Sequence, residues 1–107
     1  MAARLTLQKA LSMSLTRIAD TIRRNMRPEG FDGSIKLDCG PDGVVVIAGP
    51  EVTREDRVTD CTIALSADDL IKLMTGKLNP VTGVMLGKLK VSGDVKVAMR
   101  LGKLLKG

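Results

Sequence analysis

The chain has 107 residues and carries 17 lysines and arginines against 12 acidic residues, which gives a net charge of +5. Hydrophobic residues make up 44% and charged residues 27%, a composition typical of one globular domain around a single core. The sequence contains no histidine and one aromatic residue, Phe31, which excludes histidine-dependent triads and metal sites and argues against modules that stack nucleic-acid bases on aromatic rings.

The first predicted element is an amphipathic helix within residues 1–27. Thr6 is its predicted N-cap, and Pro28 and Gly30 end it. A basic, acid-poor segment of this kind is also typical of a mitochondrial transit peptide, but we favour a structural helix, since its removal would leave the remainder short of apolar cover. Its apolar residues follow one stripe at helical spacing: Leu7, Leu11, Leu15, Ile18, Ile22 and Met26.

Three strands are predicted next. Residues 35–39 alternate apolar and polar side chains as a half-buried strand does, and residues 44–48 form a more fully buried one. Between them, residues 40–43 have the Gly-Pro-Asp-Gly composition of a turn, so the two strands form a hairpin. Residues 49–60 are polar and predict a long surface loop or a poorly ordered edge, and residues 61–65 alternate again as a third strand.

Two helices are predicted after the third strand. Ser66 and Asp69 have the spacing of a capping box, and Gly76 is a natural residue to end that helix. The pair Asn79-Pro80 starts a short second helix, which ends near Gly87.

A further strand at residues 88–91 and a last helix complete the chain. Gly93-Asp94 opens this helix, and its apolar residues spread over more than one face: Val95, Val97, Ala98, Met99, Leu101, Leu104 and Leu105. A helix needs only one apolar stripe to pack on a sheet, so the second face implies bound lipid, another subunit or additional core. The order of elements favours an α+β domain with helices on one face of a sheet.

The two cysteines, Cys39 and Cys61, lie in apolar strand contexts and are predicted to be buried free thiols in a reducing compartment. The longest apolar run, residues 44–48, is far shorter than the roughly 20 residues that span a bilayer. We therefore expect a cytoplasmic protein, with a mitochondrial location as the less favoured alternative.

Charge is distributed unevenly along the chain. Residues 1–69 hold 9 basic and 11 acidic residues, a net −2, whereas residues 70–107 hold 8 basic residues and one acid, Asp94, a net +7. Such a segment suits an anionic partner: phospholipid headgroups, an acyl-CoA or fatty carboxylate, or nucleic acid. A solvated surface that keeps the protein soluble is the alternative.

A series of motifs runs through the second half of the chain. Its segments are Asp60-Cys61-Thr62-Ile63, Leu65-Ser66-Ala67-Asp68-Asp69-Leu70, Leu73-Met74-Thr75-Gly76-Lys77-Leu78-Asn79-Pro80, Met85-Leu86-Gly87-Lys88-Leu89-Lys90-Val91-Ser92-Gly93-Asp94 and Ala98-Met99-Arg100-Leu101. Through the order and spacing of Asn-Pro, two Gly-Lys pairs and Gly-Asp in these segments, the sequence from residue 33 to residue 105 resembles the SCP-2 (sterol carrier protein 2) sterol-binding domain family.

This resemblance implies an α+β fold with a mostly antiparallel five-stranded sheet, covered by helices that enclose a hydrophobic tunnel. Family members bind fatty acids, fatty acyl-CoAs, phospholipids or sterols there and act as carriers without chemistry of their own. The chain departs from the family at residues 105–107, where peroxisomal members have a Ser-Lys-Leu-like signal. It also has Gly83-Val84 where members often have aromatic residues, which favours a flexible acyl chain or isoprenoid over a planar sterol.

On this basis we predict a single domain over residues 1–107 that binds and transfers lipid, with no catalytic residues, metal or cofactor. The predicted tunnel lining is Phe31, Ile47, Ile63, Leu70, Leu73, Met74, Leu78, Val81, Val84, Met85, Leu89, Met99, Leu101 and Leu105. Unbranched methionines suit a permissive pocket, although each is also an ordinary core residue. The residues predicted to contact anionic headgroups or a membrane are Lys88, Lys90, Arg100 and Lys103.

The same residues also suggest other functions. The second most favoured function is an accessory module that presents a lipid, such as a quinone precursor, to a partner enzyme. Neither Gly76-Lys77 nor Gly87-Lys88 has the spacing of a phosphate-binding loop, and adjacent Asp68 and Asp69 point about 100° apart on a helix. Only the net charge would support nucleic-acid binding, so we expect no nucleic-acid partner. The expected partners are a lipid ligand, an anionic membrane surface and a partner enzyme. We expect the protein to be a monomer or a weak dimer.

Overall fold

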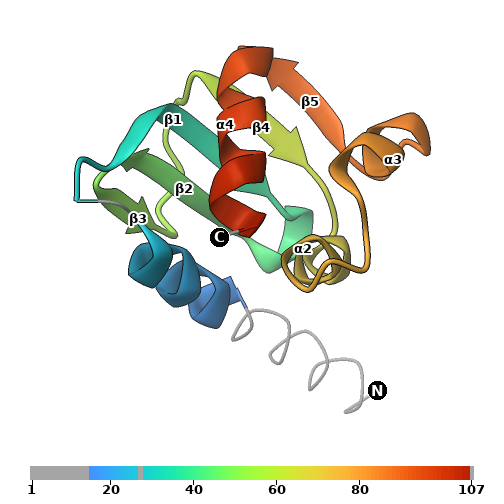
Figure 1. Ribbon diagram of the computed structural model, residues 1–107, viewed down its shortest axis with the longest axis horizontal. Coiled ribbons are helices and arrows are strands. Elements are labelled where there is room, and N and C mark those ends of the chain that lie inside the picture. Colours follow the sequence, from blue (N-terminus) through green and yellow to red (C-terminus); the bar gives the residue numbers. More distant parts are fainter. Residues whose placement is uncertain (1–14, 27, 107) are drawn as a thin grey trace.

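The computed structural model describes residues 15–26 and 28–106, and for residues 102–106 it describes the backbone alone. Figure 1 shows one sheet with helices on one face, which confirms the predicted α+β class. The described part of the first helix covers residues 15–25. The other elements are β1 (Phe31–Asp38), β2 (Val44–Gly49), β3 (Glu51–Thr53), β4 (Cys61–Ala64), α2 (Ala67–Met74), α3 (Pro80–Met85), β5 (Lys90–Gly93) and α4 (Val95–Lys106).

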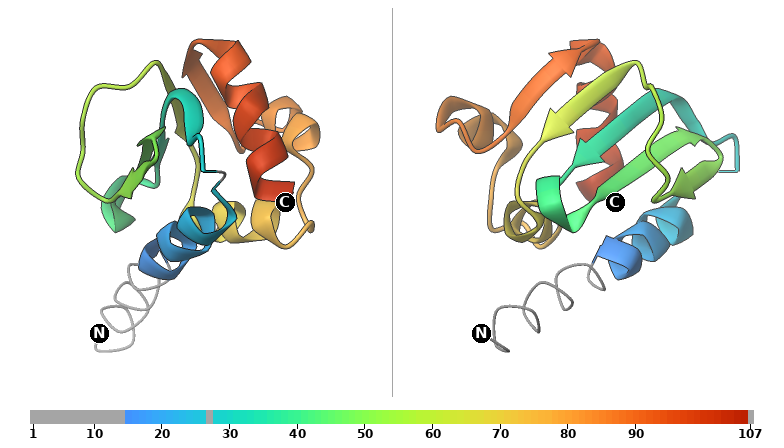
Figure 2. Two further views of the ribbon diagram at one scale, coloured as in Figure 1. Left: turned by 60° about the vertical axis from the view of Figure 1, so that its left-hand side comes forward. Right: turned by 180° about the vertical axis from the view of Figure 1, so that it is seen from behind.

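The five strands lie in the order β3-β2-β1-β4-β5. β1 pairs antiparallel with β2, as do β2 with β3 and β4 with β5, so the prediction of a mostly antiparallel sheet is confirmed. The central pair β1–β4 is parallel, with Ile35 opposite Cys61 and Leu37 opposite Ile63. A parallel neighbour requires the chain to return across the sheet, and residues 54–60 make that return (Figure 2).

Three strand predictions need correction. β1 begins at Phe31, four residues before the predicted start at residue 35, and it ends at Asp38. Residues 51–53, predicted as part of a loop or a poorly ordered edge, form β3, where Val52 lies opposite Ile47 and is buried. The last strand begins at Lys90 instead of residue 88. The reason is that the amides of Lys88 and Leu89 donate to the carbonyl of Gly83, at 2.9 and 3.1 Å, and so complete the end of α3 instead of pairing with β4.

The first helix packs on the core through Leu15, Ile18 and Ile22, as its stripe predicts, and also through Ala19, which is outside that stripe. The guanidinium of Arg23 donates to the carbonyl of Val52 at 2.6 Å, and that of Arg54 to the hydroxyl of Thr16 at 3.2 Å. These bonds hold the helix to the β2–β3 side of the sheet (Figure 1). The predicted positions Thr6, Leu7 and Leu11 lie outside the described residues.

Side chains cap the later helices where the sequence predicts. The hydroxyl of Ser66 accepts from the amide of Asp69 at 3.0 Å, and the carboxamide oxygen of Asn79 accepts from Val81 at 2.9 Å. Asp94 caps α4 by accepting from the amide of Lys96 at 2.9 Å. Each cap fixes the first turn of its helix and therefore which residues of the helix face the sheet.

Both cysteines are buried, as predicted. Ile35 lies opposite Cys61 in the β1–β4 register, and Cys39 follows four residues later along the chain. At about 3.3 Å per residue of strand this separates the two cysteines by roughly 13 Å, too far for a disulfide.

The sheet face away from the helices is covered by the returning segment, residues 54–60 (Figure 2). Lys36, on that face of β1, forms an ion pair with Asp56 of the segment. Val46 of β2 points to the same face and is buried, although it lies outside the main core cluster. The helices and this segment therefore lie on opposite faces of the sheet.

Candidate functional site

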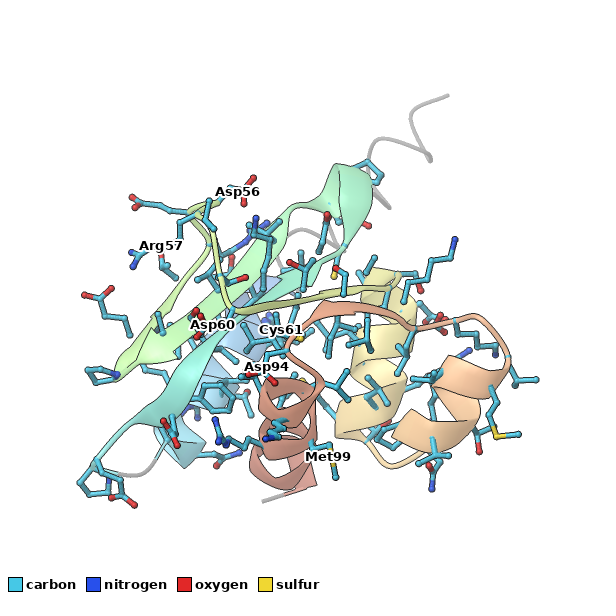
Figure 3. All side chains as sticks on the ribbon, turned by 90° about the horizontal axis from the view of Figure 1, so that it is seen from above. Asp56, Arg57, Asp60, Cys61, Asp94 and Met99 are labelled. Carbon is cyan, nitrogen blue, oxygen red and sulfur yellow. The ribbon has the colours of Figure 1, made fainter. Side chains whose placement is uncertain are left out.

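α4 carries two apolar stripes, and only one of them is used in packing on the sheet. Val97 and Leu101 are buried against the sheet, whereas Val95 and Met99 are 61% and 70% exposed. Residues two positions apart on a helix point about 200° apart, so the two stripes lie on nearly opposite sides. Figure 3 places Met99 on the flank of α4 that is turned toward α2 and α3.

α2 and α4 are in contact above the sheet (Figure 3). Ser66 starts α2 so that Leu70 points inward and is fully buried. Six apolar residues pack against the core while remaining partly exposed. One is Met26, after the first helix, and the other five come from α2, β5 and α4: Ile71, Leu73, Met74, Val91 and Ala98. We call these five residues with Met99 the α2–α4 seam.

α3 borders this region and is attached through its only buried residue, Gly83. A Cβ atom at Gly83 would lie 2.9 Å from Cγ and Cδ1 of Leu89 and 3.6 Å from Cδ2 of Leu78. Glycine therefore lets the α3 backbone approach two buried leucines directly. The apolar side chains of this helix and its C-cap point elsewhere and are exposed.

The structure divides the predicted tunnel residues into groups. Buried are Phe31, Ile47, Ile63, Leu70, Leu78, Leu89 and Leu101. Half-buried are Leu73 and Met74, and exposed are Val81, Val84, Met85 and Met99. The side chain of Leu105 lies outside the described part. Ile47 and Leu70 have no exposed surface, so an entering ligand would meet the seam residues first. The lining role of each residue stays a prediction.

The predicted headgroup residues also differ in their surroundings. Lys88 and Lys90 are exposed. The guanidinium of Arg100 donates to the backbone carbonyl of Asp32 at 3.1 Å, and the carboxylate of Asp32 lies 3.6 Å from the same nitrogen. Arg100 therefore also connects α4 to the start of β1. The side chain of Lys103 lies outside the described part.

Sequence reasoning missed two exposed lysines, Lys77 and Lys96, and two exposed apolar residues, Leu86 and Val95. The absence of any acidic residue from position 70 to position 93 is the signal that could have drawn attention to Lys77.

The titratable groups offer no activated nucleophile among the described residues. Burial, with a smaller contribution from Asp42 and Asp38, raises the pKa of Cys39 to about 11. Burial also raises the pKa of Cys61. A raised pKa keeps each thiol protonated and therefore unreactive near neutral pH. Across residues 15–26 and 28–106, no three His, Cys, Asp or Glu side chains are grouped to hold a metal ion.

The sequence also matches the profile of a known protein family. The sequence profile of the SCP-2 sterol transfer family matches residues 3–106. The chain belongs to this family.

Relatives within the SCP-2 family match the chain over much of its length. Sterol carrier protein 2 of Gallus gallus is 46% identical over 79 residues, which cover 66% of this chain and 14% of that protein. The chain therefore spans a small part of this longer relative. The family assignment supports lipid binding or transfer in general terms, whereas the particular ligand is a separate question.

Solved structures share the fold at lower identity. Sterol Carrier Protein-2 from Aedes aegypti in complex with C16 fatty acid (palmitate) has a TM-score of 0.65 at 17% identity, covering 85% of this chain and 89% of that one. The ubiquinone synthesis protein UbiJ-SCP2 has a TM-score of 0.55 at 19% identity, covering 97% and 93%. At these identities the likeness establishes the fold.

Proposed function

We propose that this SCP-2 domain binds a single-chain lipid at the α2–α4 seam and carries it between membranes without catalysing a reaction. The observation that carries the proposal is the second apolar stripe of α4, with Met99 exposed on the flank of α4 that is turned toward α2 (Figure 3). Water contact at this stripe is unfavourable, and an acyl chain that covered it would gain roughly 0.8 kcal/mol for each buried CH₂ group.

A flexible acyl chain or isoprenoid fits the seam better than a sterol. The seam is lined by aliphatic and thioether side chains, and Phe31, the sole aromatic residue, is buried in the core. Methionines adjust their shape around flexible ligands. The palmitate complex of the Aedes aegypti protein supports the same ligand class.

Lysines near the seam suit an anionic end on the lipid. Lys77, Lys88 and Lys90 are exposed on the segments that flank α3, and Lys96 is exposed in the first turn of α4. A fatty carboxylate or a phosphate at the surface would be stabilised by these charges, and so would the anionic membrane to which the cargo is delivered. Arg100 and Lys103, on α4, belong to the same predicted group.

The test is stabilisation of the delipidated protein by ligand. A fatty acid at 100 times its Kd raises the free energy of unfolding by about 2.7 kcal/mol, and each kcal/mol shifts the Tm of a domain this size by about 4–8 °C. Met99→Glu places a charge in the seam, so the Tm without ligand should change little while the fatty-acid shift is lost. Val58→Glu, at an exposed valine on the returning segment, is the matched control and keeps the shift. If fatty acids and isoprenoids of several lengths produce no shift in the unmodified protein, the proposal is wrong.

A second candidate is an accessory module that presents an isoprenoid quinone precursor to a partner enzyme. The UbiJ-SCP2 structure, which covers 97% of this chain, favours it. Palmitate separates the two candidates, because the carrier is stabilised by fatty acids as well as by isoprenoids, whereas this module is stabilised by polyprenylated rings and not by palmitate. We expect a monomer or weak dimer in either case.

A further inference from the structure

α3 exposes its apolar side chains to solvent and buries only a glycine. Val81, Val84 and Met85 occupy positions i, i+3 and i+4 and share one face, while Gly83 points to the opposite side, onto Leu78 and Leu89. Together with Leu86, these side chains are between 50% and 80% exposed. An ordinary surface helix has the reverse arrangement, with its apolar face inward.

The charge around this helix has one sign. Lys77 precedes α3 by three residues, and Lys88 and Lys90 follow it closely; all three are exposed. The sequence contains no acidic residue from position 70 to position 93. We call Val81, Val84, Met85 and Leu86, with Lys77, Lys88 and Lys90, the α3 tip.

The α3 tip projects from one end of the molecule. Figures 1 and 2 show α3 beyond β5, at the end of the domain opposite β3. Such a position leaves its apolar side chains free to contact a flat surface without interference from the rest of the domain.

We propose that the α3 tip is a membrane-contact element: its four apolar side chains enter the headgroup region of a bilayer, and its three lysines bind the phosphates of anionic lipids. Apolar side chains surrounded by lysines match the two layers of such an interface, with acyl chains below and negative charge above. None of the helices in the described part of the chain is long and apolar enough to cross a membrane.

A second copy of the chain is a poorer occupant of this surface. A two-fold contact through α3 would bring the lysines of one copy against those of the other. A stable protein interface also needs about 800 Å² from each partner, more than the exposed face of a six-residue helix provides. A bilayer has no such requirement, because lipids close around each projecting side chain.

The inference deepens the proposed lipid transfer, since it identifies the surface that meets the donor or acceptor membrane. Its test needs no cargo. Vesicle binding is measured on ligand-free protein, and ligand binding is measured without vesicles. A protein that binds vesicles through α3 but binds no lipid in solution would refute the proposed carrier function and leave this inference standing.

The first experiment places a fluorescent reporter on the tip. The sequence has no tryptophan or tyrosine, so Met85→Trp introduces a single indole at an exposed position. Val58→Trp is the matched control, because Val58 is 97% exposed and lies in the returning segment, which carries charges of both signs at Glu55, Asp56 and Arg57. Figure 3 shows Asp56 and Arg57 of this segment at the opposite end of the molecule from α3.

With phosphatidylcholine vesicles that contain phosphatidylserine, we expect the emission of Met85→Trp to shift to the blue and to be quenched by brominated lipid chains, while Val58→Trp stays in water. Without phosphatidylserine, or at high salt, the shift should be largely lost. The inference is wrong if the protein does not bind anionic vesicles, or if it binds them while the Met85→Trp indole stays in water. It is also wrong if the indole shifts with protein concentration alone, which would indicate a second copy.

The second experiment measures affinity by vesicle flotation. The double variant V84D/M85D should lose at least tenfold in partitioning onto anionic vesicles, because two apolar side chains are replaced by charges of the wrong sign. Each of Lys77→Gln, Lys88→Gln and Lys90→Gln should lose about fivefold. Val58→Asp should not change partitioning, and thermal unfolding verifies that each variant is folded. Equal partitioning of V84D/M85D and the unmodified protein would overturn the inference.

Discussion

The contact between Gly83 and Leu89 offers a sharp test of how α3 is attached. A Cβ atom added at Gly83 would lie 2.9 Å from both Cγ and Cδ1 of Leu89, closer than carbon atoms approach in packed proteins. The α3 backbone cannot easily move away, because the carbonyl of Gly83 accepts bonds from the amides of Lys88 and Leu89. Gly83→Ala therefore overpacks the contact.

Two opposing effects set the size of the change. Alanine stabilises a helix by about 1 kcal/mol relative to glycine, while overpacking a tight contact costs about 1–3 kcal/mol. We expect Gly83→Ala to destabilise the protein by about 1 kcal/mol net, a fall in Tm of about 4–8 °C. Thr82→Ala, at a neighbouring exposed position, gains helix propensity without the clash and should raise stability by a few tenths of a kcal/mol at most.

A double-mutant cycle isolates the clash. Leu89→Ala alone should cost about 2–5 kcal/mol, because it removes a buried side chain. In that background the new Cβ has space, so adding Gly83→Ala should become neutral or stabilising, with a coupling energy of about 1–3 kcal/mol. Thermal and urea unfolding of the four proteins gives this energy. If Gly83→Ala stabilises the protein when Leu89 is present, α3 is not packed as described and our account of its attachment fails.

Two further predictions concern stability. Gly93→Ala should lower the free energy of unfolding by at least about 2 kcal/mol, because Gly93 has a φ of +89° and its new Cβ would collide with the carbonyl oxygen of Asp60. Gly76 has a φ of +77° and open space around it, so Gly76→Ala should lower it by only about 1 kcal/mol. Urea unfolding measures both changes. Cys39 has a pKa of about 11 when folded against 9.0 for a free thiol, so between pH 9 and pH 11 the unfolded chain loses its proton first and stability should fall with pH, by at most about 1.4 kcal/mol per pH unit. Cys39→Ala should remove that part of the slope, and an unchanged slope would refute the assignment.

Much of the fold follows from local patterns in the sequence. The caps at Ser66 and Asn79 and the stripe from Leu15 to Ile22 are set by neighbouring residues, and each prediction is confirmed. β3 was not found as a strand because Glu51–Thr53 is too short to show a period, and it is stabilised by pairing with β2. The parallel direction of β1 and β4 depends on the path of residues 54–60, which carry no signal of direction.

The candidate site was harder to predict, for a physical reason. Periodicity shows that Val81, Val84 and Met85 share one face of a helix, but it does not show whether that face points inward or outward. The deciding residue is Gly83, which packs on Leu89 and so turns the apolar face to solvent. Likewise, the two stripes of α4 are visible in the sequence, but only the structure shows that Val97 and Leu101 contact the sheet.

The parallel β1–β4 pair also closes a longer loop than the β1–β2 hairpin does. The β1–β2 hairpin closes across six positions, from Asp38 to Val44, whereas pairing Ile35 with Cys61 closes 26. The longer closure costs about 1.3 kcal/mol more in chain entropy, so the hairpin can form first and serve as the template on which β4 docks. β5 pairs only with β4, and α4 follows β5. We therefore expect the contact between α2 and α4 to form on a sheet in which β1, β2 and β4 are already paired.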